Sequence, residues 1–448
     1  MSRIREAVAG SVAGLVAFFL RLAGRGATSL PGRVLLAIDP RSISERAARL
    51  PAGSIVVSAT NGKTTTCAML AGIAEEAGHR PVHNRAGANM AGGVASALLA
   101  GDGDMGLFEV DEFWLDSLVP QIHPRAVVLS NLFRDQLDRY GELDTISSRW
   151  AALAASPAAG CLVLNSDDPS IAALGLDRDG VVYFGVRDDA AGYGHPRHAS
   201  EQVSCPACGA GLSYATWYVG HLGDYRCPEC GWARPEAQVR ASGVALRGLG
   251  GSSFDLELDG RRERIDLPLP GLYNVYNALA AAAGALAFGL SPETIFTGLG
   301  SAVAVFGRAE SVEVEGRSCS ILLVKNPAGA NEVIGTVGME GGRHDVLFVL
   351  NDRIADGRDV SWIWDADFED LAGTVGTAVC SGTRAVEMAM RLRYAGVENV
   401  QVIEELPAAL SAAAAGDGDR LLALPTYTAM LELRELLADQ GAASPSFA

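Results

Sequence analysis

Short apolar runs alternate with longer stretches of helical spacing along most of the chain. One series occupies residues 54 to about 190, and a second begins after residue 308. Strands that alternate with helices in this way are typical of parallel sheets covered by helices. We therefore predict two α/β units, whose apolar runs begin at residues 54, 106, 126, 161, 181, 320, 346, 377 and 421.

The segment between the two series has a different character. Residues 192–236 are rich in glycine, proline, cysteine and histidine, and residues 244–271 have the pattern of antiparallel strands. Residues 271–290 form an alanine-rich stretch that predicts a helix. The organisation that we predict is a lead segment over 1–48, a central domain over 49–308 with an insertion at about 200–235, and a C-terminal domain over 309–448.

An apolar stretch of 14 residues, 7–20, lies near the N-terminus. It is shorter than the roughly 20 residues that a helix needs to cross a bilayer. The start is weakly basic, but the following residues offer no clean cleavage site of the kind that ends a signal peptide. We expect a helix that packs on the domain or lies on a membrane surface, with a signal peptide as the alternative.

The first apolar run leads into a candidate phosphate-binding loop. Ser54–Ser58 is followed by a turn at 60–62, and helical spacing starts at Thr64. Strand, tight turn and helix form the context in which Gly-Lys-Thr binds phosphate, because backbone N–H groups of the helix N-terminus point at the anion. The Lys63 ammonium would reach the outer phosphates, and the Thr64 hydroxyl would hold Mg²⁺. Val57 occupies the place of the usual first glycine, and a chance Gly-Lys-Thr at a helix start is the alternative.

Composition strengthens the case for this loop. Of the 36 basic residues, only Lys63 and Lys325 are lysines, and the others are arginines. A chain that uses arginine for general positive charge keeps lysine where a compact ammonium is needed. Lys325 also lies at the end of an apolar run, so both lysines are candidates for an active site. The alternative is that these two lysines are present by chance.

The charge and hydropathy exclude some functions. The net charge of −17 argues against a surface for nucleic acid or an anionic membrane. A hydrophobic content of 49% is that of a globular protein with more than one core. Since an ATP site would have no use outside the cell, we expect a cytoplasmic protein.

Four cysteines form a metal-ligand pattern. Two C-x2-C pairs are separated by 18 residues, and they comprise Cys205, Cys208, Cys227 and Cys230. This spacing is typical of a four-thiolate zinc ribbon, whose closed coordination sphere gives it a structural role. Disulfides are the alternative, and the intracellular character of the chain disfavours them. We expect the nearby His221 and His198 to lie on the surface.

Several motifs together resemble the Mur ligases, the ATP-dependent amide-forming enzymes of peptidoglycan synthesis. TNGKTTT (60–66) is similar to the G-T-N-G-K-T-T loop of that family, which has no glycine at the place of Val57. Ala59 replaces its first glycine, which alanine can do if its φ is negative. The resemblance identifies Glu109 of EVDE as a Mg²⁺ ligand, Asn277 of YNVYNALAA as an adenine contact, and Arg308 of FGRAE as a residue that closes on the γ-phosphate.

Other segments resemble one branch of this family, the MurT type. They are the zinc ribbon and the stretches at 84–93, 325–332, 355–370 and 381–396, within a resemblance that covers about residues 30–435. It implies a Mur-ligase-like central P-loop domain with an inserted four-cysteine zinc ribbon, followed by a Rossmann-like α/β C-terminal domain. Proteins of this type amidate the α-carboxylate of D-glutamate in the membrane-anchored lipid II stem peptide, with ammonia from a GatD-like glutaminase partner. This would place the chain at the inner face of the cell membrane.

The resemblance also implies roles for individual residues. ATP converts the carboxylate into an acyl phosphate, which ammonia can attack. Lys63, Arg308 and a Mg²⁺ held by Thr64 and Glu109 would neutralise the transferring phosphoryl group, and Lys325 would meet the acyl phosphate when the domains close about a hinge near 306–316. The implied nucleotide-binding set is Thr60, Asn61, Gly62, Lys63, Thr64, Thr65, Asn277 and Arg308.

A second metal ion is left open. The amino-acid-adding Mur ligases hold a second Mg²⁺ with a carbamylated lysine, and this chain has no lysine for that role. Either one metal suffices, or Asp135, Gln136 and Asp138 organise the second; a capped turn with an acidic surface is the alternative for that cluster. Asn89 corresponds to a Mur position near the substrate diphosphate.

The chain has no evident means of hydrolysing glutamine, which needs an activated cysteine beside a histidine. In the C-terminal domain the candidate pair is Cys380 and His344, and nothing in the sequence brings them together. We therefore expect a partner on the stretch 351–368, where Asp356 or Asp359 would orient the partner's catalytic histidine. The alternative is that this stretch is a turn whose two tryptophans, Trp362 and Trp364, pack into the core.

Two other functions fit parts of the pattern. An amino-acid-adding Mur or folylpolyglutamate-type ligase would join an amino acid in place of ammonia, and a comparison of these acceptors would separate the two. A P-loop protein of another class would bind ATP and use its zinc ribbon as a docking module, and it would show no substrate-stimulated ADP formation.

Overall fold

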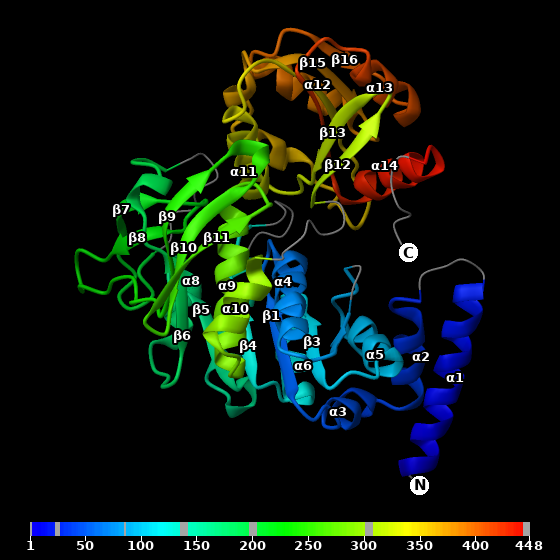
Figure 1. The fold of residues 1–448 in the computed structure, drawn as a ribbon, viewed down its shortest axis with the longest axis vertical. Helices are drawn as coiled ribbons and strands as arrows, with labels where there is room; N and C mark the ends of the chain where they lie inside the picture. Colours follow the sequence, from blue (N-terminus) through cyan, green and yellow to red (C-terminus); the bar gives the residue numbers. More distant parts are fainter. Residues whose placement is uncertain are drawn as a thin grey trace.

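Two α/β units make up the molecule (Figure 1). A cleft lies between them. The computed structural model describes residues 2–22, 27–84, 87–134, 142–196, 204–300 and 308–441. The larger unit is built on a nine-stranded sheet and the smaller one on a six-stranded sheet, and a two-stranded hairpin accompanies the larger sheet. The α/β character predicted from the apolar runs is confirmed for both units.

The larger sheet is parallel over seven strands and ends in two antiparallel ones. Its order is β11-β10-β9-β6-β5-β4-β1-β3-β2, with β10 and β11 antiparallel. Its strands are β1 (Gly53–Ser58), β2 (Pro81–His83), β3 (Met105–Glu109), β4 (Ala126–Leu129), β5 (Cys161–Asn165), β6 (Val182–Val186), β9 (Val239–Leu246), β10 (Ser252–Leu258) and β11 (Arg261–Leu267).

Helices bury both faces of the central part of this sheet, which explains why β1, β3, β4 and β5 are apolar almost throughout. In β1, Ile55 and Val57 point into one core layer and Val56 into the other. The first layer is covered by α4 (Lys63–Glu76), α9 (Leu272–Phe288) and α10 (Pro292–Gly300). The second is covered by α1 (Ser2–Leu22), α2 (Leu30–Ile38), α3 (Ser42–Ala47), α5 (Ala91–Ala100), α6 (Leu115–Ile122), α7 (Glu142–Ala154) and α8 (Pro169–Ala172).

The strand order places a ligand-binding edge beside β1. The chain runs from β1 to the sheet edge at β2, returns to β3 on one side of β1, and then crosses to β4 on the other side. In open α/β sheets, ligands bind at the carboxyl ends of strands where the order reverses in this way. The carboxyl ends of β1, β3 and β4 therefore define the candidate site.

The smaller sheet has the order β12-β13-β17-β14-β15-β16, in which only β12 is antiparallel to its neighbour. Its strands are β12 (Arg308–Val314), β13 (Arg317–Leu322), β14 (His344–Val349), β15 (Val375–Ser381), β16 (Val400–Val402) and β17 (Arg420–Pro425). One face packs on α11 (Pro327–Gly338), η6 (Ser361–Asp365), η7 (Phe368–Leu371) and α12 (Ala385–Tyr394), and the other on α13 (Leu406–Ala414) and α14 (Tyr427–Asp439).

The remaining elements are short. The hairpin consists of β7 (Ser213–Trp217) and β8 (Gly223–Arg226), and single 3-10 turns are η2 (Pro157–Ala159), η3 (Ala173–Gly175), η4 (Asp189–Ala191) and η5 (Gly248–Gly250). The apolar stretch near the N-terminus lies in helix α1, as expected, and α1 packs on α2. Within the described residues, no helix combines the length and apolarity needed to cross a membrane.

Candidate active site

A cleft of about 620 Å³ lies between the two units. The loop after β1, the ends of β3 and β4 and the start of α9 line it from the larger unit. The start of α11 and the loops after β14 and β17 line it from the smaller unit. All six residues from Thr60 to Thr65 line the cleft, as do Asn89, Asn277 and Lys325. The structure thus brings together in one cavity residues that lie far apart in the sequence.

The loop after β1 has the tight turn that phosphate binding requires. Gly62 has φ +88°, and a Cβ atom there would lie 1.9 Å from Asn277 Oδ1. Only glycine avoids both the strain and the clash. Asn131, at the end of β4, holds the turn, since its side chain accepts from Asn61 N at 2.9 Å and donates to Asn61 O at 2.9 Å. Ala59 has a negative φ, so its replacement of the family glycine carries no backbone strain.

Lys63 is buried at the start of α4. Its ammonium forms an ion pair with Glu112 Oε2 at 2.9 Å and donates to the backbone oxygens of Ala59 and Thr60. Burial lowers the pKa of Lys63, but the negative charges of Glu112 and Glu109 outweigh this effect and raise it above its usual value. The residue is therefore a fixed cation inside the loop, as binding of a polyphosphate needs.

Thr64 and Glu109 form the polar pair expected of a Mg²⁺ site. The Thr64 hydroxyl donates to Glu109 Oε2 at 2.9 Å. Asn84, which follows β2, accepts from Glu109 N at 2.9 Å and donates to Glu109 O at 2.7 Å. Hydroxyl and carboxylate oxygens are the hard ligands that Mg²⁺ prefers, so this pair fits the ion chemically. Asn84 fixes the main chain of Glu109 and so orients its carboxylate.

Two side chains of the smaller unit reach the phosphate-binding loop. Lys325 Nζ donates to Thr60 O at 3.2 Å. Asn326 and Asn61 exchange side-chain amide hydrogen bonds of 3.1 and 3.2 Å, while Asn326 also caps α11 by accepting from Gly329 N at 2.9 Å. The two units therefore meet at the nucleotide loop itself, and the ammonium groups of Lys325 and Lys63 both donate to Thr60 O.

A buried polar network supports the start of α9, which carries Asn277. Asp167, fully buried after β5, accepts from Tyr276 Oη at 2.7 Å and pairs with Arg234 at 3.2 Å. Burial raises the pKa of Asp167, against the lowering effect of Arg234. Asn277 donates to Asn274 Oδ1 at 3.0 Å and accepts from the Thr66 hydroxyl at 3.4 Å. The residue expected to contact adenine is thus held by its neighbours on α9 and α4.

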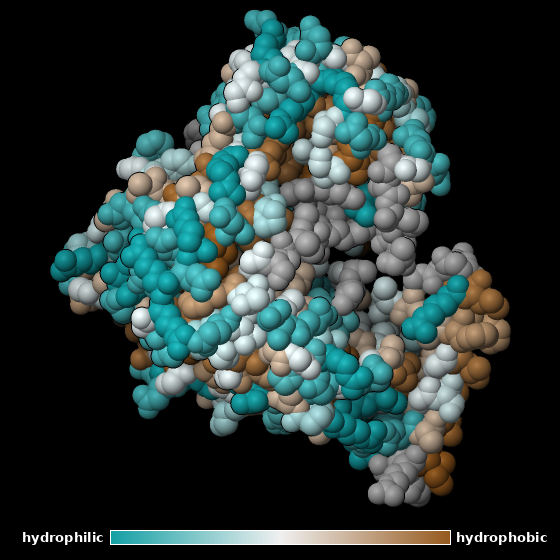
Figure 2. All heavy atoms as spheres, in the orientation of Figure 1, coloured by the Kyte–Doolittle hydropathy of each residue, from teal (hydrophilic) through white to brown (hydrophobic). Residues whose placement is uncertain are grey.

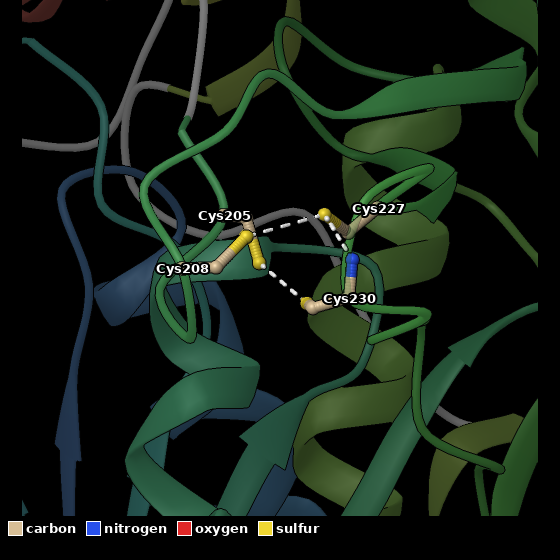
Figure 3. A group of neighbouring side chains, drawn as sticks. All are labelled: Cys205, Cys208, Cys227 and Cys230. Atoms are coloured by element: carbon tan, nitrogen blue, oxygen red, sulfur yellow. Dashed lines mark hydrogen bonds between the residues drawn. The ribbon is translucent and has the colours of Figure 1, made fainter.

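The four cysteines of the insertion converge (Figure 3). Their sulfur atoms all lie within 4.8 Å of one another, with Cys205–Cys230 at 3.6 Å and Cys208–Cys227 at 3.5 Å. Tetrahedral zinc, with Zn–S bonds of about 2.3 Å, needs sulfur atoms about 3.8 Å apart, and a disulfide needs about 2 Å. A hydrogen bond from Cys230 N lowers the pKa of Cys227 to about 6, which favours its thiolate. The cluster fits a metal ion and excludes disulfides in this structure.

One expectation about this insertion is wrong. His221 is buried, not exposed, because its ring packs edge-on against Phe133 and its Nε2 lies 3.3 Å from Asp168 Oδ2. Asp168 is itself fully buried and caps α8. The hairpin folds back onto the larger sheet at this point, a contact that the local sequence pattern did not indicate. His198 lies outside the described residues.

The two candidate aspartates of the stretch 351–368 differ in their surroundings. Asp356 lines the cleft, is 4% exposed and accepts from Thr428 N at 2.7 Å. Asp359 is partly exposed and accepts from Ser361 N at 2.8 Å, and this hydrogen bonding lowers its pKa. The core interpretation of the tryptophans holds for Trp362 and is wrong for Trp364, which is 48% exposed.

The structure also separates the only cysteine–histidine pair considered for the C-terminal domain. His344 begins β14 and pairs with Val375, whereas Cys380 pairs with Phe348 towards the other end of the two strands. Of the remaining expected site residues, Arg308 begins β12, with its side chain outside the described part of the chain. Asp135, Gln136 and Asp138 also lie outside the described residues.

Comparison with known proteins assigns the chain to a family. The model of the Mur ligase middle domain matches residues 57–205, and that of the MurT ligase C-terminal domain matches residues 323–430. A Streptococcus pneumoniae (strain ATCC BAA-255 / R6) protein named lipid II isoglutaminyl synthase (glutamine-hydrolyzing) subunit MurT is 34% identical over 431 residues, covering 94% of this chain and 95% of that protein. The chain belongs to the MurT family.

A second MurT protein gives a similar alignment. The protein of the same name from Staphylococcus aureus (strain COL) is 32% identical over 425 residues, with 93% of this chain and 94% of that protein covered. Membership of the MurT family makes the chain an ATP-dependent ligase of the Mur type, and this wider family uses ATP and Mg²⁺.

Solved structures support the fold. A pseudomurein peptide ligase type C from Methanothermus fervidus aligns with a TM-score of 0.67 at 23% identity, covering 86% of this chain and 78% of that one. MurF from Acinetobacter baumannii aligns with a TM-score of 0.64 at 19% identity, covering 92% and 80%. The MurT chain therefore has the Mur-ligase fold in both of its α/β units.

Proposed function

We propose that this chain is the ligase subunit that amidates the α-carboxylate of D-glutamate in the lipid II stem peptide, giving D-isoglutamine. The observation that carries the proposal is the cleft, where the phosphate-binding loop and Lys63 of one unit face Lys325 of the other. The near full-length similarity to proteins named lipid II isoglutaminyl synthase supports the same substrate. An amino-acid-adding ligase is not favoured.

The proposed reaction has two steps. A carboxylate oxygen of D-glutamate attacks the γ-phosphorus of ATP, a new O–P bond forms, and the bond to the bridging oxygen breaks to release ADP. Ammonia then attacks the carbonyl carbon of the acyl phosphate to form the C–N bond, the C–O bond breaks, and phosphate leaves with the proton that the nitrogen loses. The first step gathers negative charge near the loop, which the buried Lys63 ammonium stabilises.

Other residues position the reactants in this proposal. Thr64 and Glu109 would hold Mg²⁺, which would supply positive charge to neutralise the phosphates. Asn277 lies beside Gly62 and contacts adenine, and Lys325 contacts the acyl phosphate from the smaller unit. Arg308, at the junction of the proposed domains 49–308 and 309–448, closes on the γ-phosphate. Zn²⁺ at the four cysteines stabilises the insertion and takes no part in the chemistry.

Ammonia is proposed to come from a GatD-like glutaminase subunit. An apolar surface on the smaller unit, which we call the α12 patch, is suited to a partner and comprises Trp364, Val386, Met390 and Tyr394. Trp364 and Tyr394 meet edge to face at 5.5 Å, and Arg391 lies 5.4 Å from the Trp364 ring centre. Exposed aromatic residues and methionine are typical of interface cores. Asp359 lies two residues before η6, which carries Trp364, and its partly exposed, ionised carboxylate is suited to orient a partner's histidine.

The function is tested by measuring phosphate release and product mass with lipid II as acceptor. We expect the isolated chain to amidate with ammonium and not with glutamine, and to accept no amino acid in place of ammonium. Incorporation of an amino acid would favour the alternative ligase, and glutamate release from glutamine by the isolated chain would remove the need for a partner.

The partner role is tested with Asp359→Asn and Asp356→Asn in the complex. We expect Asp359→Asn to impair the glutamine-driven reaction and to spare the ammonium-driven one, because its carboxylate is partly exposed and does not line the cleft. Asp356→Asn also loses an acceptor for Thr428 at the cleft wall, so we expect it to slow both reactions. If both variants keep full glutamine-driven activity, neither aspartate orients a partner residue.

A further inference from the structure

Helix α1 has two faces of opposite character. Ala9, Ala13 and Ala17 form a small-residue face that is buried, and α1 packs there on α2. Along the opposite face, large apolar side chains are 39–74% exposed: Ile4, Val8, Val12, Leu15, Phe18, Phe19 and Leu22. We call this the α1 apolar face, and Figure 2 shows it as hydrophobic surface along the outer side of α1. The spacing of these residues keeps them on one side of a helix.

We propose that the α1 apolar face lies on an anionic lipid surface, with the helix parallel to the membrane plane. A helix of 21 residues is about 31 Å long, and its exposed side chains would enter the boundary between headgroups and acyl chains. No described helix is apolar enough to span a bilayer, and α1 is already fixed to the domain by its alanine face. The geometry therefore fits a helix that lies on a membrane.

The local charge favours an anionic surface, although the whole chain is strongly negative. The first 26 residues contain four arginines and one glutamate, whereas the chain carries a net charge of −17. The one glutamate, Glu6, forms an ion pair with Arg49 of the domain. Arg5 and Arg21 are exposed at opposite ends of α1. Anionic lipid would therefore attract this edge of the molecule and repel the rest, which fixes the orientation of the chain.

The helix that carries this face is rigidly connected to the cleft. Gly32 of α2 approaches α5 so closely that a Cβ atom would lie 1.9 Å from Gly92 O, and its N–H donates to Ser96 Oγ at 2.8 Å. Helix α5 begins at Ala91, directly after Asn89 and Met90, which line the cleft. If the proposed function holds, this arrangement brings a membrane-anchored acceptor to the cleft over the N-terminus of α5.

Sedimentation with vesicles tests the proposal directly. The full chain is mixed with vesicles of phosphatidylcholine that contain about one-third phosphatidylglycerol, and the bound fraction is measured. We expect binding that weakens with salt, and we expect Phe18→Glu/Phe19→Glu to lower the partition coefficient at least about tenfold. Val386→Glu/Met390→Glu is the matched control, since it makes the same change on the exposed face of α12. Phe18→Ser/Phe19→Ser tests the loss of apolar surface without added charge.

The outcomes are distinct. The proposal is overturned if the unmodified chain does not sediment with the vesicles, or if the α1 and α12 variants lose binding equally. It is also overturned if the unmodified chain forms a dimer that Phe18→Glu/Phe19→Glu dissociates, because a second copy would then cover this face. Binding to vesicles without any amidation activity would leave the membrane contact intact and remove the proposed function.

Discussion

Removal of Arg234 should destabilise the larger unit in a way that depends on pH. The side chain is 12% exposed and pairs at 3.2 Å with Asp167, which is fully buried. Arg234→Met leaves that carboxylate with neutral donors, namely Tyr276 Oη and Val186 N at 2.7 Å and Ser166 Oγ at 3.0 Å. Loss of one partner of a buried pair costs about 3–5 kcal/mol. Because the neutral donors remain, we expect the lower end, about 3 kcal/mol.

The pH dependence follows from the raised pKa of Asp167. A carboxyl group whose folded pKa lies above its unfolded value binds more protons in the native state, so its contribution to stability is full below the unfolded pKa. That contribution is lost as pH rises through the folded pKa. Arg234 lowers the pKa of Asp167, so its removal raises that pKa further. The pH range over which the stability contribution is lost then extends to higher pH. The loss in free energy of unfolding caused by Arg234→Met should therefore be largest at neutral and alkaline pH and should shrink as pH falls.

Thermal unfolding at several pH values measures this effect. At about 2–4 °C per kcal/mol for a unit of this size, about 3 kcal/mol corresponds to a fall in Tm of about 6–12 °C. Arg262→Met is the matched control, because Arg262 pairs with Asp255 at 2.6 Å at the surface of the same sheet, where solvent screening leaves little stability to lose. The double variant Asp167→Asn/Arg234→Met should recover more than half of the Tm that Arg234→Met loses. The reasoning would be refuted if Arg234→Met lowered Tm no more than Arg262→Met does, or if the fall in Tm did not change with pH.

Four further changes test the site. Lys63→Arg should lower kcat about 10²–10³-fold in a phosphate-release assay while leaving Tm unchanged, because the buried loop fits an ammonium and not a planar guanidinium; normal turnover would remove Lys63 from the chemistry. Gly62→Ala should raise the KM for ATP at least about tenfold by displacing Asn277, and an unchanged KM would contradict the adenine role. Glu109→Gln should raise the Mg²⁺ concentration for half-maximal activity about tenfold, and no shift would mean that Glu109 is not a ligand. Cys227→Ser should reduce metal content from about one zinc per chain to almost none and lower Tm, and a zinc-free but equally stable parent protein would exclude a structural metal.

Local patterns were predictable from the sequence, and long-range partners were not. The strand, turn and helix around Lys63 and the convergence of the four cysteines follow from short-range spacing, and the structure has both. The partners of the loop come from distant segments: Glu112 pairs with Lys63, and Asn326 pairs with Asn61 across 265 residues. Single polar residues of this kind carry no periodic signal, although the second glutamate of EVDE was one available hint.

The same limit explains the error at His221. A histidine in a polar, glycine-rich insertion is usually exposed, and only the way in which the hairpin folds back onto Asp168 and Phe133 buries it. The chain order could not reveal this contact, because it depends on the docking of the insertion against the larger sheet. Trp364 shows the reverse case, since a core position was one interpretation of this tryptophan and the fold leaves it at the surface.

The scarcity of lysine gives this protein a chemical handle. Its two lysines, Lys63 and Lys325, line the same cleft, one from each unit. Amine-acylating reagents would therefore modify no side chain other than these two and would leave the arginine side chains intact. Lys63 is buried, paired with Glu112 and held protonated by its raised pKa, so Lys325 reacts first. Peptide mass mapping of Lys325 would then report closure of the two units over the cleft. A bifunctional amine reagent that joins the two would lock the units together at a single pair of atoms.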